Sequence, residues 1–125
     1  MPKEYSRTLR VGDQIRRELA ELLREELKDP RVRLVTINDC EVSRDLSHAR
    51  VYVTTMDREH PQEEVVAALN HAAGFLRREL GRRMHIRTVP RLRFIYDETL
   101  DRAERIDRLL DEVGAAEGPD GQDPD

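Results

Sequence analysis

A helical stretch that carries small residues and then two pairs of arginines is the part of the chain best suited to bind a ligand. Apolar residues recur there at three- and four-residue spacing, which predicts one buried helix face: Val65, Leu69, Ala72, Leu76 and Leu80. Gly74 lies inside this pattern, and a glycine costs about 1 kcal/mol relative to alanine in a helix interior. We therefore expect a bend near Gly74 or a close approach by another backbone, with a packing glycine in an ordinary helix as the alternative.

The arginines after Gly74 have the chemistry to bind nucleic-acid phosphates. Guanidinium groups are planar and hold a phosphate through two parallel hydrogen bonds. Consecutive helical residues point about 100° apart, so we expect only about half of these arginines to contact one ligand. A solvated surface would show similar clusters. The candidate nucleic-acid-binding residues are two small residues at the bend, the arginines after it and one arginine of the first predicted helix: Ala72, Gly74, Arg77, Arg78, Arg82, Arg83, Arg87, Arg91, Arg93 and Arg10.

Side chains suited to catalysis or metal binding are few and poorly spaced. No two of the four histidines have the His-x-x-x-His spacing of a helical metal site. The single cysteine, Cys40, lies in a strand-like run and is expected to be a small buried apolar residue. We therefore expect no enzymatic activity, no cofactor and no metal. If the protein were instead an enzyme, its titratable candidate residues would be His48, His60, His71, His85 and Asp45.

The charge is divided unevenly along the chain. The formal net charge is -4. Residues 1–97 carry 19 Lys and Arg against 16 Asp and Glu, whereas residues 98–125 carry 3 against 10. Twenty of the 22 basic residues are Arg, which suits phosphate contacts, although a GC-rich coding bias would give the same enrichment. A mildly basic folded part and an acidic tail are predicted.

Periodicity predicts the elements of the first half. A helix is expected over about residues 7–28, ended by Asp29 and Pro30, with an apolar stripe of Leu9, Ile15, Leu19, Leu22, Leu23 and Leu27. A strand over residues 34–42 and a second strand that buries Ala49, Val51 and Val53 flank a hairpin loop at 43–47. The apolar phase of the first strand changes along its length, which predicts a bulge near residues 38–39.

The second half is predicted to contain two helices and a strand. One helix begins at or beside Pro61 and runs to about Met84 with its bend near Gly74. A strand over residues 90–96 points Leu92, Phe94 and Tyr96 at the core. A last helix follows Asp97, and residues 114–125 form an acidic tail expected to be disordered.

Length and hydropathy indicate one domain with one core. At 125 residues the chain buries roughly two-thirds of its unfolded surface without disulfides or metal. No apolar stretch approaches the length of a membrane span, and the first residues lead into a charged helix without a signal-peptide core. We therefore expect a cytoplasmic protein with no membrane partner.

The element order α-β-β-α-α-β, with small residues at a bend in the middle helix, resembles a type II KH-like domain of the α+β class. Five short motifs follow one another along the chain: Lys-Asp-Pro-Arg-Val at 28–32, Val-Ser-Arg-Asp-Leu-Ser-His-Ala at 42–49, Ala-Ala-Gly-Phe-Leu-Arg at 72–77, Val-Pro-Arg-Leu-Arg-Phe at 89–94 and Asp-Arg-Leu-Leu at 107–110. In this order they resemble the ribosome-binding factor A family over about residues 7–112. We therefore expect one domain over residues 1–113, which includes a C-terminal helix, and a tail over residues 114–125.

The resemblance implies a non-catalytic RNA-binding assembly factor. Such a factor binds the free or immature small (30S) ribosomal subunit, assists late maturation and 5′-end processing of 16S rRNA, and takes part in cold adaptation. The resemblance also implies an Ala-x-Gly kink in place of the usual KH Gly-x-x-Gly loop, matched here by Ala72, Ala73 and Gly74. The expected partners are the small subunit and its rRNA, and the protein is expected to be a monomer.

A second class of function stays open from the residues alone. The sheet or the leucine-rich last helix would serve a protein-interaction module that docks a ribosomal protein or an assembly GTPase. Base stacking has little support, since Tyr52 is the one aromatic residue expected on an outward strand position.

Overall fold

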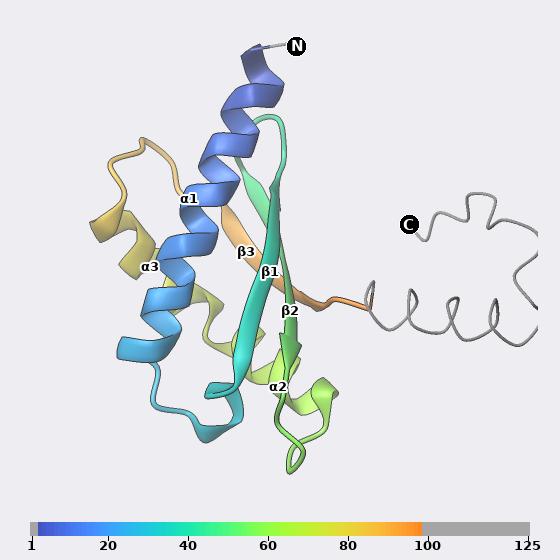
Figure 1. Ribbon diagram of the computed structural model, residues 1–125. Coiled ribbons are helices and arrows are strands. Elements are labelled where there is room, and N and C mark those ends of the chain that lie inside the picture. The colour runs from blue at the N-terminus through green and yellow to red at the C-terminus, as the bar shows by residue number, and fades with distance from the viewer. Residues whose placement is uncertain (1–2, 99–125) are drawn as a thin grey trace, which may run out of the picture.

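The computed structural model describes residues 3–98 and has the predicted α-β-β-α-α-β order (Figure 1). A short 3-10 helix, η1, is added between the first helix and the first strand. The elements are α1 (Lys3–Glu25), η1 (Pro30–Val32), β1 (Val35–Val42), β2 (His48–Thr55), α2 (Gln62–His71), α3 (Ala73–Arg83) and β3 (Arg91–Tyr96). The predicted last helix and the tail at 114–125 lie outside the described residues.

One mixed sheet carries the fold. Its strand order is β1-β2-β3, with β1 antiparallel to β2 and β2 parallel to β3. The helices cover one face, where the predicted strand residues are buried: Ala49, Val51, Val53, Leu92 and Phe94. Tyr96, predicted to face the core, is only half-buried. Arg50 and Arg93 are register partners on the other face and are exposed.

The first helix follows its predicted stripe but differs at both ends. Ile15, Leu19 and Leu22 are fully buried, whereas Leu9 is 54% exposed, so its place in the stripe was wrong. Gly12 occupies the buried position near it instead. The helix begins at Lys3 and ends at Glu25, before the predicted end at residue 28. Asp29 and Pro30 do not end α1, because they start η1: the Asp29 carboxylate accepts from the Arg31 backbone N–H at 2.9 Å.

The predicted bulge lies where the apolar phase of β1 changes. Register is lost between Ile37 and Asp39 opposite β2, and both Ile37 and Cys40 are buried. A bulge adds one residue to one strand, and two residues spaced by three thereby reach the same face. The sequence was therefore sufficient to place this irregularity.

The middle helix is broken rather than smoothly bent. α2 ends at His71 and α3 begins at Ala73, while Ala72 has φ −89° and ψ 3°, outside regular helix. The break therefore precedes Gly74 by two residues. The buried stripe continues across it, since Val65, Leu69, Leu76 and Leu80 are all fully buried. The apolar face is kept because both helices pack on the same core.

A contact that sequence reasoning missed sets the position of α1 on the sheet. A side chain carbon added at Gly12 would lie 2.5 Å from the backbone oxygen of Cys40 in β1. Such a distance is a clash with main-chain atoms, which cannot rotate away. Gly12 is thus required for the close approach of α1 to β1.

We predict that Gly12→Ala lowers the free energy of unfolding by about 1–3 kcal/mol, because the added methyl group forces α1 away from β1. Urea unfolding measures the change. Gly81→Ala is the matched control, since its new carbon would meet only the Val89 Cγ2 at 3.5 Å. Equal stability of Gly12→Ala and the wild type would contradict the clash.

Candidate nucleic-acid interface

The helix break is built from small residues and ordinary hydrogen bonds. The Ala72 N–H is shared between the carbonyls of Ala68 and Leu69, each at 3.1 Å, and the Ala72 carbonyl accepts from Leu76 N–H at 2.9 Å. Ala72 and Ala73 are half-buried against the core. The end of α2 and the first turn of α3 therefore meet at the break, and only small side chains cover the backbone there.

Gly74 lies in the first turn of α3 with its side-chain position open. Its φ is outside the left-handed region, and a carbon added there would meet only the Arg78 Nη1, at 3.8 Å. The bend therefore does not need a glycine for backbone conformation or for packing within the described chain. What Gly74 provides is a bare stretch of helix surface beside the Arg78 guanidinium.

A groove lies along the starts of β2 and β3 and reaches α2 at Asn70, two residues before this break. Its volume is about 780 Å³. Three arginines line it, together with residues of the β1–β2 hairpin: Arg50, Arg91, Arg93, Ser43 and His48. A second hollow of about 440 Å³ continues along α2 and β3 toward Tyr96. Positive charge is thus concentrated at the end of the sheet nearest the helix break.

Asn70 separates the two hollows and lines both. Its side-chain Nδ2 donates to the Phe94 carbonyl at 3.0 Å, and its Oδ1 accepts from the Phe94 N–H at 2.8 Å. These two bonds occupy the main-chain groups of the sheet edge that faces α2. Asn70 consequently holds the end of α2 against β3 and fixes the width of the groove.

The four arginines of α3 point in different directions, as their helical spacing predicts. The Arg77 Nε donates to the Val89 carbonyl at 3.0 Å, which fixes the segment before β3. Arg82 is exposed and lies 3.8 Å from Glu79. Arg78 is exposed, and within residues 3–98 it has no ion-pair partner. Of the four, Arg78 is therefore the one best placed to meet a phosphate beside Gly74.

Arg83 lies against α1 instead. Its guanidinium is within 3.5 Å of Glu18, 2.9 Å of Glu21 and 3.1 Å of Glu25, and its side chain is 25% exposed. The carboxylates of Glu25 and Glu18 raise the pKa of Arg83, with the hydrogen bond to Glu25 as the largest cause. The structure thus gives Arg83 a packing role between α3 and α1.

The remaining predicted arginines divide between two places. Arg91 and Arg93 line the groove, and Arg87 is exposed in the segment between α3 and β3. Arg10 is exposed on α1, which packs on β1 and α3 rather than on α2. Arg10 is therefore outside the groove, whereas Asn70, Arg50, His48 and Ser43 belong to it and were not predicted. Strand register brings Arg50 and His48 beside β3, and helix packing brings Asn70 there; Ser43 and His48 belong to the motif at 42–49, but nothing in that motif shows that it lies beside β3.

The hairpin that borders the groove is held by one carboxylate. Asp45 accepts from the Ser43 hydroxyl at 2.8 Å, the Ser47 hydroxyl at 2.7 Å and the Ser47 N–H at 3.1 Å. These bonds, that of the Ser47 hydroxyl first, lower the pKa of Asp45 to about 2. Leu46 has a φ of 61°, which a non-glycine residue adopts only where its surroundings impose it.

Two of the candidate histidines in the described residues have local hydrogen-bond partners: the His60 Nδ1 lies 2.6 Å from the Asp57 Oδ2, and the His48 Nδ1 lies 2.9 Å from the Ser47 hydroxyl. Cys40 is buried, and desolvation raises the pKa of its thiol to about 12. Over residues 3–98, no group of three or more His, Cys, Asp or Glu side chains is placed to hold a metal ion. Tyr52 is half-buried, and its hydroxyl donates to Glu41 at 3.2 Å.

Comparison with known proteins decides the family. A protein-family model described as ribosome-binding factor A matches residues 7–110. The chain belongs to the ribosome-binding factor A family. A relative of that name from Thioalkalivibrio sulfidiphilus is 54% identical over 125 residues, covering 100% of this chain and 97% of the relative. One from Nitrosospira multiformis is 50% identical over 117 residues, covering 94% and 93%.

Solved structures of the ribosome-binding factor A family share the fold. The crystal structure of the Thermus thermophilus protein has a TM-score of 0.64 and 34% identity, covering 71% of this chain and 94% of that one. A Thermus thermophilus model fitted into a cryo-EM map of a 30S–RbfA complex has a TM-score of 0.61 and 33% identity, covering 73% and 96%. The family name denotes a ribosome-binding factor, which is a non-enzymatic kind of protein. Within the described residues, the helices are too short or too polar to cross a bilayer.

We predict that Asn70→Ala widens the groove and lowers the free energy of unfolding by about 1–3 kcal/mol, because it leaves the Phe94 N–H and carbonyl without their partner. Amide exchange at Phe94 should accelerate more than exchange elsewhere in β3. His71→Ala, at the neighbouring exposed position, is the control. Unchanged protection of Phe94 in Asn70→Ala would show that the two bonds do not hold the sheet edge.

Proposed function

We propose that this protein binds the free or immature small ribosomal subunit through the groove between α2 and β3. In doing so it assists late maturation and 5′-end processing of 16S rRNA as a monomeric, cytoplasmic, non-catalytic factor. The observation that carries the proposal is the arginine-lined groove beside the Ala72 break. Membership of the ribosome-binding factor A family and the likeness to a protein fitted into a 30S complex support it. Residues 1–113 act as the binding domain, with 114–125 as an acidic tail.

A single-stranded rRNA segment fits this arrangement for steric and electrostatic reasons. A sugar–phosphate backbone can approach the open surface at Gly74 without meeting a side chain, and Arg78 lies beside that surface. Arg91 and Arg93 then supply positive charge along the groove. KH-type folds hold single strands between such a helix junction and a strand. The chain's own contribution is to position these groups, and no covalent chemistry is involved.

Charge along the groove predicts a measurable salt dependence. Each neutralised phosphate of a single strand releases counterions and contributes about −0.7 to the slope of log K against log salt. Four phosphate contacts therefore give a slope of about −3. Specificity is expected to come from the shape of the subunit, because the residues that line the groove include no Phe, Tyr or Trp on which a base could stack.

Gradient sedimentation tests the proposal directly. We expect the purified protein to sediment with free or immature small subunits and not with full ribosomes. Crosslinked nucleotides, once sequenced, should fall in one region of 16S rRNA. Sedimentation chiefly with full ribosomes, or with no ribosomal fraction under gentle salt, would refute the proposal.

We predict that replacing Arg78, Arg91 and Arg93 together by Gln weakens subunit binding and makes the salt slope shallower by about 2. Each replacement at these exposed positions should change the free energy of unfolding by only about 0.5 kcal/mol or less. Filter binding over a salt series measures both the affinity and the slope.

The matched control for this variant removes three exposed arginines elsewhere, Arg7, Arg17 and Arg58, and should leave the slope almost unchanged. Arg83→Gln is a second control, expected to lower stability without a change in slope, because its partners are the glutamates of α1. Equal slopes for the groove variant and the wild type would mean that the groove arginines only face solvent.

We predict that Gly74→Ala weakens subunit binding while the free energy of unfolding stays equal or rises by up to about 1 kcal/mol. Alanine favours helix, and the added carbon meets nothing closer than 3.8 Å within the described chain. Calorimetry and subunit binding on the same variant measure the two effects, with Gly81→Ala as control. Full binding would show that the bare surface at Gly74 is not approached by RNA, and unfolding would show that Gly74 is a packing residue.

A further inference from the structure

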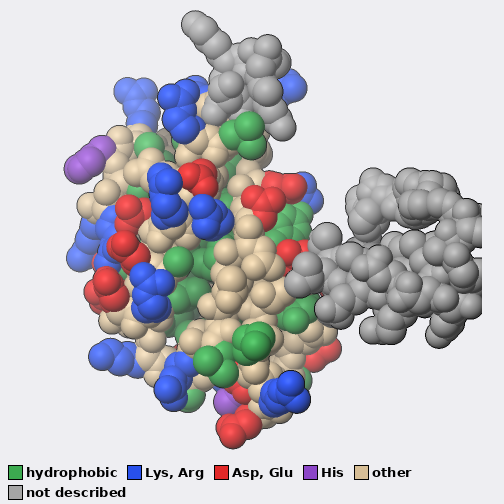
Figure 2. All heavy atoms as spheres, viewed as in Figure 1, with side chains coloured by type: hydrophobic (Ala, Val, Ile, Leu, Met, Phe, Trp, Pro, Cys, Tyr) green, Lys and Arg blue, Asp and Glu red, His purple; other side chains and the backbone are tan. Residues whose placement is uncertain are grey.

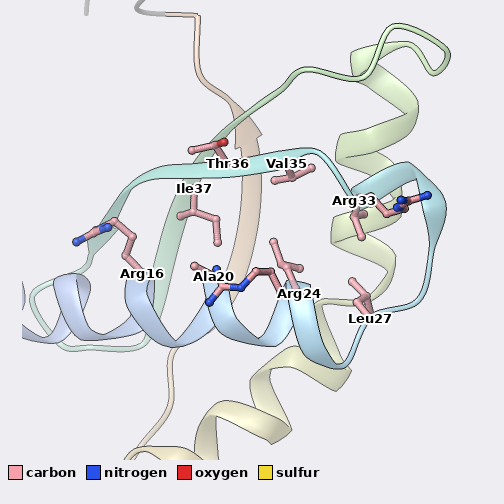
Figure 3. A pocket seen from close by; sticks show the side chains of 10 residues that line it. Arg16, Ala20, Arg24, Leu27, Arg33, Val35, Thr36 and Ile37 are labelled. Atoms are coloured by element: carbon pink, nitrogen blue, oxygen red, sulfur yellow. The ribbon is translucent and has the colours of Figure 1, made fainter.

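A second groove lies on the other side of the molecule, between α1 and β1. α1 touches β1 closely at Gly12 and then diverges from it, so the gap widens toward the C-terminal end of the helix. The resulting hollow has a volume of about 650 Å³. Figure 2 shows hydrophobic side chains in the middle of this face, with Lys and Arg side chains and also Asp and Glu side chains around them. Figure 3 shows the lining residues, which come from α1, from the segment with η1 that follows it and from the start of β1.

The floor of this α1–β1 groove is apolar. Leu23, Val32 and Ile37 line it and are 7%, 2% and 8% exposed. Val35 and Leu27, also in the lining, are half-buried. The groove can therefore take up apolar side chains of modest size, because moving apolar surface out of water is favourable.

The strand above the floor is the open edge of the sheet. β1 is the first strand in the order and, among residues 3–98, pairs only with β2. The Leu34 carbonyl accepts from the Met56 N–H at 3.2 Å, so it points toward β2. Because successive main-chain groups alternate along a strand, those of Val35 and Ile37 point away from β2, over the groove. An extended chain laid in the groove would thus find hydrogen-bonding groups on one side and an apolar floor on the other.

The rim of the groove is positively charged. Arg16, Arg24 and Arg33 line it, and none of its described lining residues is acidic. Arg16 is paired with Asp13 at 2.7 Å. Arg24 and Arg33 are exposed and have no ion-pair partner among residues 3–98. In Figure 3, Arg16 and Arg24 rise from α1 into the gap below β1, while Arg33 lies at the far end.

We propose that the α1–β1 groove docks an extended segment of a protein partner in which apolar and acidic residues alternate. The segment pairs with the open edge of β1, buries its apolar side chains on the Leu23 floor and places its carboxylates against Arg24 and Arg33. RNA would use the positive charge but neither the apolar floor nor the strand edge, so a peptide fits more of the observed features. The proposal concerns a different surface from the groove lined by Arg50, Arg91 and Arg93, and it does not rest on the function proposed for that groove.

The test uses a nine-residue peptide of alternating valine and glutamate, with blocked ends, titrated into the isotope-labelled full chain. We expect saturable amide shifts at residues 33–37 and in the C-terminal half of α1. A peptide with lysine in place of glutamate should bind at least about tenfold more weakly. A peptide N-methylated on alternate residues cannot complete the strand pairing, so its affinity should also be about tenfold lower.

Variants of the protein test the rim. Arg24→Gln combined with Arg33→Gln should lower the affinity for the acidic peptide about fivefold. The matched control, Arg7→Gln with Arg58→Gln, has the same net charge and should bind as the wild type does. The Arg24 and Arg33 variant should also bind small subunits normally. Failure of the peptide-docking proposal can then be told apart from failure of the proposed small-subunit binding.

Four outcomes would overturn the proposal. They are the absence of saturable shifts in the groove, equal binding of the N-methylated peptide, and displacement of the peptide by an oligouridine that shifts the same amides. The fourth is peptide binding only after removal of residues 114–125, which would identify the acidic tail of the chain as the occupant.

Discussion

The parallel pairing of β2 with β3 is the constraint on which the arginine-lined groove at Arg50, Arg91 and Arg93 depends. Parallel neighbours cannot be joined by a tight turn, so the chain must cross the sheet through α2 and α3 before β3 begins. That crossover places the Ala72 break beside the start of β3. Asn70 then fixes the junction through its two bonds to Phe94. Backbone hydrogen bonding in the sheet thereby decides where the basic residues gather.

α1 is held by a close backbone contact near its middle and by charge in its C-terminal half. Gly12 allows its backbone to touch β1, and the Arg83 guanidinium binds three of its glutamates. Between these points the helix diverges from the strand and leaves the α1–β1 groove. The two grooves therefore arise from different constraints on opposite edges of the sheet, and a substitution in one need not disturb the other.

Much of the fold could be predicted because its signals are local. The alternation of Ala49, Val51 and Val53, the phase change at the bulge and the stripe from Val65 to Leu80 all follow from the periods of strands and helices. Element ends were harder to place: Pro30 indicated the end of a helix but starts η1, because Asp29 caps that turn. The likeness of several short motifs to ribosome-binding factor A was confirmed by the family match over residues 7–110.

By itself the sequence determined the order of the elements, the small residues at the helix break and the family. Only the tertiary structure decided which arginines share a surface. Arg83 and Arg78 belong to the same short helix, yet one lies against α1 and the other is exposed beside Gly74. Arg50 reaches the groove because it lies beside Arg93 in the register of the parallel strands. Contacts between residues distant in the chain depend on helix packing and strand register, which the local pattern of residues does not encode.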